Sequence, residues 1–241
     1  MLITADMKMA DLIHLDFQLL AVIQRIGIPL GFREKTIDEV CIENGVNTDF
    51  FLQLSNSFHD KEYFPKEKFL RFNPEWLVNF LRRTHQCYME HKIPEIEEQI
   101  IQLENDLKGT KQSYELIKNF FTEYIRELGV HIELEEKKVF PYVMALSESI
   151  ANKEISSDLN ESFGDYNIDK YLEDHNDIEE KLFDLKNILI KYLPPPTDNC
   201  KYNSLLFEIF KLEKDLKDHS KLEEKVLIPR VRMMESELNN L

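Results

Sequence analysis

The sequence has little of what a turn-rich, disulfide-bonded or membrane-spanning protein needs. It contains only 6 glycines and 9 prolines among 241 residues, which favours long helices over a β fold with many tight turns. Its 3 cysteines are far apart and odd in number, so they predict no disulfide framework. No stretch reaches the roughly 18 consecutive apolar residues that a membrane-spanning helix requires. We therefore expect no membrane partner and a reducing, cytoplasmic location.

Positive charge is also scarce. The chain has 30 basic and 45 acidic residues, for a formal net charge of −15, which would repel a nucleic-acid backbone and predicts no nucleic-acid partner. The first residues, MLITADMKMADLIHLDF, carry acidic groups where a signal peptide would carry basic ones, so we expect no secretion signal. With 43% hydrophobic and 11% aromatic residues, the chain can bury a sizeable core.

The spacing of apolar residues predicts an all-α protein in two parts. Residues 1–57 contain several short apolar runs separated by turn signals, which indicates a small helical N-terminal domain, and 58–73 is expected to be a linker. Residues 74–241 are predicted to form a four-helix up-down bundle. Its helices are expected at 74 to about 107 with a kink at Pro94, about 111–146, 167–193 and about 202–237, with a polar connection at 147–165.

Four of the seven histidines lie on the apolar stripes of these helices, one on each. They are His85, His131, His175 and His219. A single buried histidine is usually a hydrogen-bonded core residue, but burying four without partners would cost about 2 kcal/mol each. Binding a metal would satisfy all four together, whereas the alternative is a metal-free bundle held by buried hydrogen bonds between histidine and glutamate.

Two glutamates follow two of these histidines by one helical turn. Glu135 follows His131 and Glu223 follows His219, and residues four apart face the same way on a helix. The surrounding segments, HIELEEKKVFP (131–141) and HSKLEEKVLIP (219–229), match at six of eleven positions. A further histidine precedes each segment at a similar interval. The pattern is a two-fold internal repeat, in which each half supplies two histidines and one glutamate.

The ligand types select the metal. Imidazoles and carboxylates without a thiolate disfavour structural zinc and iron–sulfur clusters, and paired metals bridged by carboxylates in a bundle are the di-iron or di-manganese solution. We predict two iron ions, for which manganese or zinc are possible substitutes. Glu135 and Glu223 would bridge them, with two histidines on each ion. An oxide, a hydroxide or another small anion would complete the site.

These motifs resemble the hemerythrin-like, or HHE cation-binding, family. More closely, the chain resembles the two-domain iron–sulfur-cluster repair di-iron proteins over nearly its whole length. The resemblance places the metal ligands on RTHQCYMEHKIPEI, HIELEEKKVFP, LEDHND and HSKLEEKVLIP, which supply His85, His131 with Glu135, His175, and His219 with Glu223. Gln86 and His91 are the alternatives to His85, since some relatives place a histidine at the position of Gln86.

Two departures from these families matter. Hemerythrins proper have a fifth histidine where this chain has Tyr171, which favours the four-histidine repair branch over an oxygen carrier. Repair proteins usually carry a cysteine pair in the N-terminal domain, but GIPLGFREKTIDEVCIENGV has no cysteine before Cys41. We expect Cys41, Cys87 and Cys200 to be buried apolar residues. Tyr171 and Tyr124 are expected mainly to pack, the run from Glu136 to Lys138 to face solvent, and Phe120, Phe121, Phe140, Phe183, Phe207 and Phe210 to lie in the core.

The resemblance implies a protein of nitrosative or oxidative stress that assists iron–sulfur cluster repair. It would bind or reduce nitric oxide at the di-iron site, or donate iron to a damaged cluster, and the missing cysteine pair favours chemistry at the di-iron site. Its partners would be nitric oxide or dioxygen, together with iron–sulfur proteins. Two alternatives remain: a sensor or store of oxygen, nitric oxide or iron without turnover, and a structural bundle whose N-terminal helices bind another protein.

Overall fold

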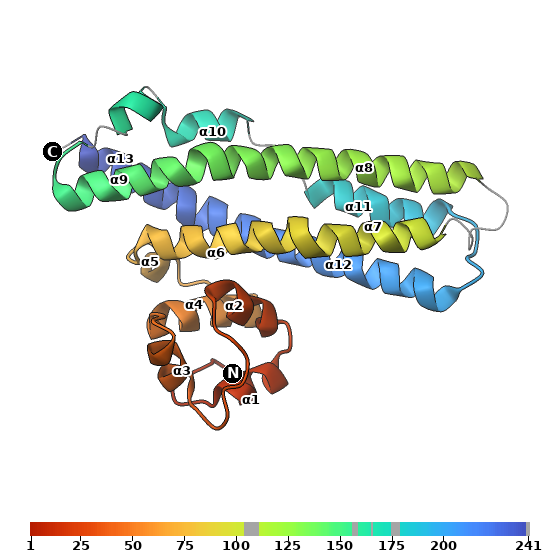
Figure 1. The fold of residues 1–241 in the computed structure, drawn as a ribbon, viewed down its shortest axis with the longest axis horizontal. Helices are drawn as coiled ribbons and strands as arrows, with labels where there is room; N and C mark the ends of the chain where they lie inside the picture. Colours follow the sequence, from red (N-terminus) through yellow and green to blue (C-terminus); the bar gives the residue numbers. More distant parts are fainter. Residues whose placement is uncertain (104–110, 156–158, 165, 175–178, 240–241) are drawn as a thin grey trace.

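A computed structural model describes residues 1–103, 111–155, 159–164, 166–174 and 179–239 (Figure 1). The described chain is helical, and its only bridge of β type is an isolated one between Lys8 and Thr36. Long helices run side by side, and a compact group of short N-terminal helices packs beneath one of them. The predicted all-α architecture is confirmed. His175 lies outside the described residues.

The N-terminal helices are short because strong start and stop signals follow one another closely. Thr36 and Glu39 form a reciprocal capping box at the start of α3, and the side chain of Asn47 caps α4. Gly27 ends α2 with a left-handed φ of 92°, which glycine adopts without steric cost. The helices are α1 (Met9–Leu15), α2 (Leu19–Ile26), α3 (Ile37–Glu43), α4 (Thr48–His59) and α5 (Lys66–Phe69).

Four helical segments form the bundle. The first begins at the predicted cap, Asn73, with Pro74 in its first turn. It comprises α6 (Pro74–Cys87), η1 (Tyr88–Lys92) and α7 (Ile93–Gln102), and the second comprises α8 (Lys111–Leu134), η3 (Glu135–Val139) and α9 (Phe140–Asn152). The third comprises α10 (Ile168–Asp174), α11 (Glu179–Asn187) and η5 (Ile188–Tyr192), and the fourth α12 (Asn199–Leu222), η6 (Glu223–Leu227) and α13 (Ile228–Leu238).

The structure corrects several predicted boundaries. The second segment continues to Asn152, because Leu146 and Ser149 are buried against the core. The connection expected at 147–165 therefore begins inside this helix, and it also contains a π-helical turn, η4 (Leu159–Phe163). The described parts of the third segment are two short helices and a π-helical turn. At Pro94, the π-helical turn η1 precedes the proline and the helix continues as α7.

The buried apolar residues form two clusters at different levels of the bundle. One joins the N-terminal helices to one half of the bundle, and its bundle residues include Leu81, Phe140 and Val226. The other lies along the opposite half of the bundle and includes Tyr88, Leu128 and Leu216. The proposed division into domains at 57 and 73 stays a prediction, and the N-terminal helices share a core with the bundle.

Some residues expected in the core are on the surface. Phe183, Phe207 and Phe210 are 56%, 65% and 45% exposed, because they lie off the apolar stripes of α11 and α12. Phe121 and Phe140 are buried as expected. Cys41 is buried and Cys87 half-buried, but Cys200 is exposed in the first turn of α12. Among the described residues, no helix is both long enough and apolar enough to cross a membrane.

Candidate metal centre

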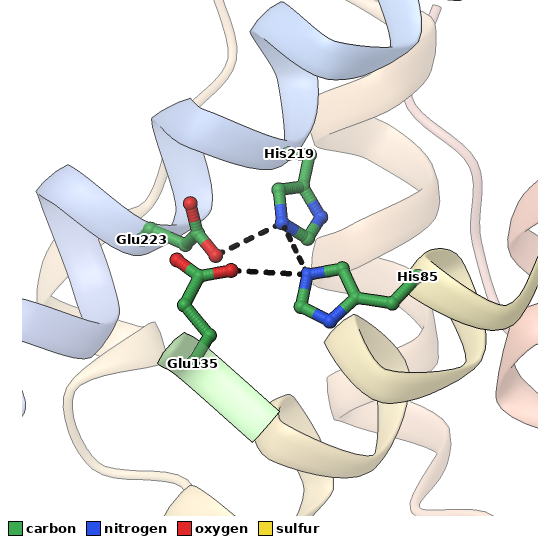
Figure 2. Close-up of side chains that lie close together, drawn as sticks. All are labelled: His85, Glu135, His219 and Glu223. Atoms are coloured by element: carbon green, nitrogen blue, oxygen red, sulfur yellow. Dashed lines mark hydrogen bonds and ion pairs between the residues drawn. The ribbon is translucent and has the colours of Figure 1, made fainter. Parts of the chain in front are cut away.

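Four of the six predicted ligands converge inside the bundle (Figure 2). His85 comes from α6, Glu135 begins η3, His219 comes from α12 and Glu223 begins η6. One potential ligand atom of each lies within 4.8 Å of those of the other three, and all four side chains are buried. They form a polar layer between the two hydrophobic clusters, so groups from three separate helical segments meet with little access for water.

The two histidines face one another through the same ring atom. Nε2 of His85 lies 3.1 Å from Nε2 of His219, as Figure 2 shows. Nε2 of His219 is also 2.9 Å from Oε1 of Glu223, and Nε2 of His85 is 3.2 Å from Oε2 of Glu135. Two imidazole nitrogens and two carboxylate oxygens thus point at one small volume, which is the arrangement a cation needs.

Glu135 lies between two imidazoles and uses a different oxygen toward each. Its Oε2 faces His85, while its Oε1 is 3.3 Å from Nε2 of His131 on the preceding helical turn. His131 is therefore in contact with the cluster although it lies on its outer side and is half-buried. A carboxylate placed this way can bind one cation through each oxygen.

Tyr171 on α10 also reaches the site. Its hydroxyl donates a hydrogen bond of 2.5 Å to Oε1 of Glu135, and the residue is only 3% exposed. Burial, with the negative charge of Glu135 next to it, raises the pKa of Tyr171, so the hydroxyl keeps its proton. The expected packing role was incomplete: this tyrosine also fixes the orientation of a predicted bridging carboxylate.

Glu136 is a site residue that the sequence interpretation missed. It was expected on a solvated face, but its Oε1 lies 2.9 Å from Nδ1 of His85, and its Oε2 accepts from Nε of Arg82 at 3.2 Å. This contact turns Nε2 of His85 toward the cluster, as the outer partners of metal-binding histidines do. The repeat gives no signal for this role, since the matching glutamate of the second segment, Glu224, is exposed.

Burial and neighbouring charges drive the pKa values of the two facing histidines apart. Burial alone would lower the pKa of His85, but its interactions with Glu135 and Glu136 outweigh this and raise it to about 9. Burial, reinforced by the charge of His85, lowers the pKa of His219 to about 3. Without a metal, His85 is thus the protonated member and can donate to the neutral ring of His219.

Glu223 shows the cost of burying a carboxylate. Burial raises the pKa of Glu223 to about 7. Among the described residues, both oxygens of Glu223 and Oε2 of Glu135 are buried without a geometrically sound hydrogen bond, although imidazole nitrogens lie at ion-pair distance. Buried carboxylate oxygens without a hydrogen bond, next to imidazole nitrogens, are a donor set that a metal ion satisfies, so these residues fit a bound cation.

The backbone places both glutamates at the start of a π-helical turn. The carbonyl of Glu135 accepts from the amide of Phe140, and that of Glu223 from the amide of Ile228, five residues on in each case. Pro141 and Pro229 follow directly. A proline has no N–H to donate, and its ring clashes with the carbonyl four residues before it in an α-helix. The wider turn relieves that conflict, so the proline of each repeat determines the backbone geometry at its glutamate.

The alternatives for the first ligand lie on the outside of the helix. Gln86 and His91 are exposed, whereas His85 is buried at the cluster. The structure therefore brings His85, Glu135, His219 and Glu223 together, with His131 beside them. The remaining predicted ligand, His175, lies outside the described residues.

The comparison with protein families agrees with this geometry. The family model described as the hemerythrin HHE cation binding domain matches residues 78–231, which include every residue of the cluster. No curated protein matches the chain significantly.

Proposed function

Because the chain belongs to the hemerythrin HHE cation-binding family, we propose that its bundle holds a pair of iron ions that bind a small diatomic molecule. The observation that carries this proposal is the buried cluster of two histidines and two glutamates. Its ligands are His85, His131, Glu135, His175, His219 and Glu223. When bound, such a centre supplies redox-active metal sites for dioxygen or nitric oxide.

The chain's own residues have separate tasks in this proposal. His85 and His219 would hold one ion together, because their Nε2 atoms face one another. His131 would help to hold the other ion, since its Nε2 lies beside the second oxygen of Glu135. Glu136 and Arg82 hold His85 from behind, and Tyr171 holds Glu135. The surrounding apolar clusters exclude water, and the buried layer admits only a small ligand.

For the cellular role, we favour assistance to iron–sulfur cluster repair under nitrosative or oxidative stress. Support comes from Tyr171 at the position of the fifth histidine of hemerythrins and from the short helices that precede the bundle. Burial raises the pKa of Cys41 to about 12, so this thiol is a poor ligand at neutral pH. This favours nitric oxide binding or reduction at the metal pair over thiol-dependent iron delivery.

Iron content tests the proposal directly. Protein produced in iron-replete medium should contain about two iron ions per chain, with an antiferromagnetically coupled pair by Mössbauer spectroscopy. Glu135→Ala and Glu223→Ala should each lower pair occupancy strongly, because a buried bridging oxygen is lost. His91→Ala is the matched control on an exposed helix face. Less than one iron per chain, or equal effects of all three substitutions, would contradict the ligand set.

Rapid mixing with nitric oxide separates turnover from simple binding. A reductase supplied with an added electron donor would release nitrous oxide over repeated cycles, since two nitric oxide molecules take up two electrons and two protons to give nitrous oxide and water. A sensor or store would form a stable nitrosyl spectrum once per site, without nitrous oxide. The closed, buried site is compatible with this second function, which depends on binding alone.

A further inference from the structure

The N-terminal helix α2 meets the bundle beside the metal cluster through a buried arginine. Arg25 is 3% exposed, and its Nη1 donates to Oδ1 of Asp215 at 2.7 Å. Its Nη2 donates to Oδ2 of the same carboxylate, so the pair is bidentate. Asp215 lies on α12 one helical turn before His219, and the ion pair therefore fixes the turn of α12 that carries this histidine.

The same guanidinium also contacts the helical segment that carries His85. It lies over the ring of Tyr88, 5.5 Å from the ring centroid. Tyr88 is fully buried in η1, directly after α6, and the centroid of its ring is 5.9 Å from that of His219. Arg25 thus touches one residue from each of the two segments whose histidines face one another.

The end of α2 is itself held by the bundle. Nη1 of Arg83, two residues before His85, donates to the backbone carbonyl of Arg25 at 3.2 Å. This guanidinium packs against Gly27, where a Cβ would lie 2.1 Å from Nη1. The left-handed φ favours glycine, and a side chain at this position would displace the guanidinium of Arg83, so glycine lets α2 lie against α6 at this point.

We propose that Arg25 is a positioning residue that holds His85 and His219 at the separation a metal ion requires. The short N-terminal helices, which lie outside the bundle, would then help to position the metal ligands inside it. The inference rests on the proposed function only in taking these two histidines as ligands. Removing the guanidinium would leave α6 and α12 packed but free to shift at the site.

Cobalt(II) is a suitable probe, because its visible absorption reports ligand geometry. Arg25→Met should weaken Co(II) binding about tenfold or more, as loss of an outer-shell partner does, and change the visible spectrum. Lys186→Met is the matched control. It breaks another buried ion pair of α12, in which Lys186 Nζ lies 2.5 Å from Oε2 of Glu213, and should leave the spectrum unchanged.

A double substitution separates positioning from stability. Arg25→Met leaves the Asp215 carboxylate without its partner, which destabilises the protein by itself. Adding Asp215→Leu removes that charge, so the unfolding midpoint should recover while the Co(II) spectrum stays altered. Arg25→Lys, which keeps the charge but not the bidentate contact, should fold and show an intermediate spectrum.

These measurements distinguish failure of the positioning role of Arg25 from failure of the metal site itself. If the wild-type protein binds Co(II) and Arg25→Met matches it in affinity and spectrum, the positioning role is wrong and the metal site stands. If the wild type binds no Co(II), the metal site fails, and hydrogen exchange then tests Arg25 in the metal-free protein. Amides of residues 216–223 should exchange faster in Arg25→Met than in Lys186→Met, and equal exchange would overturn the inference.

Discussion

At the scale of single residues, the two facing histidines of the candidate centre have pKa values shifted in opposite directions. The imidazoles of His85 and His219 are 3.1 Å apart, yet the first has a pKa of about 9 and the second about 3. The difference arises because the interactions of His85 with Glu135 and Glu136 outweigh its burial, whereas burial and the neighbouring charge of His85 both lower the pKa of His219. A cation that binds between them must displace the proton of His85.

This arrangement predicts that metal binding releases a proton at pH 8. At that pH His85, with a pKa of about 9, is still mostly protonated, whereas Glu223, with a pKa of about 7, is already ionised. Apparent metal affinity should rise up to about tenfold per pH unit between pH 7 and pH 9, where His85 alone must lose a proton, and level off above pH 9. A pH indicator in weakly buffered solution, during titration with Co(II), measures the released proton.

Glu136→Gln is the control for this assignment. It removes the negative charge behind Nδ1, so the pKa of His85 should fall and less proton should be released at pH 8. Glu90→Gln, an exposed carboxylate on the same helical segment as His85, should leave the release unchanged. Affinity independent of pH between 7 and 9 would show that His85 is not the displaced acid.

At the scale of helices, two of the π-helical turns begin at candidate ligands. The bundle segments that carry Glu135 and Glu223 contain a proline six residues after the glutamate, and both widen into a π-helical turn at that glutamate. An uninterrupted α-helix would give better backbone hydrogen bonding but would rotate each glutamate and the turn before it relative to the residues that follow. The prolines prevent this relaxation.

Replacing one of these prolines should therefore raise the stability of the metal-free protein and lower its metal affinity. Pro229→Ala restores an N–H and lets η6 compete with a regular α-helix, so the metal-free protein should gain on the order of 1 kcal/mol in unfolding free energy. Its metal affinity should fall, because Glu223 leaves its position. Chemical denaturation and Co(II) titration measure the two quantities.

Pro74→Ala is the matched control, because Pro74 occupies the first turn of α6, where proline is well tolerated. This variant should keep the metal affinity of the wild type. If Pro229→Ala and Pro74→Ala bind metal equally well, the π-helical turn at Glu223 is not required for the site.

At the scale of the whole molecule, the polar layer of candidate ligands connects parts of the chain that are far apart in sequence. The N-terminal helices share a core with the bundle on one side of the layer, and a second core fills the bundle on the other side. Within the described residues, three buried carboxylate oxygens of this layer, both of Glu223 and Oε2 of Glu135, have no hydrogen bond. A buried polar atom without a partner costs stability, and a bound cation would offset that cost.

Metal should consequently stabilise the entire fold. Free ion at 100 times its dissociation constant should add about 2.7 kcal/mol to the unfolding free energy, and a chelator should remove this increment. Glu223→Ala should abolish the metal-dependent part. Glu224→Ala, at the adjacent exposed position, should retain it. Thermal unfolding with and without metal checks the prediction, and equal increments in both variants would contradict it.

Much of this organisation is readable from the chain itself. Apolar residues at helical spacing are enough to predict the bundle, because a helix buries the same stripe whatever it packs against. The repeat of His131 with Glu135 and of His219 with Glu223 indicates ligands, because positions four apart share a helix face. Asn73 and Pro74 mark the start of α6, since capping acts within a few residues.

Contacts between distant segments were decided only by the tertiary structure. Glu136 behind His85, Tyr171 on Glu135 and Arg25 on Asp215 join residues far apart in the chain, and no local pattern encodes such a distance. The same holds for Phe183, Phe207 and Phe210, whose exposure depends on which helix faces remain uncovered. Local spacing determined which side chains share a helix face, while packing between helices determined which of those faces meet, because that choice depends on the whole core at once.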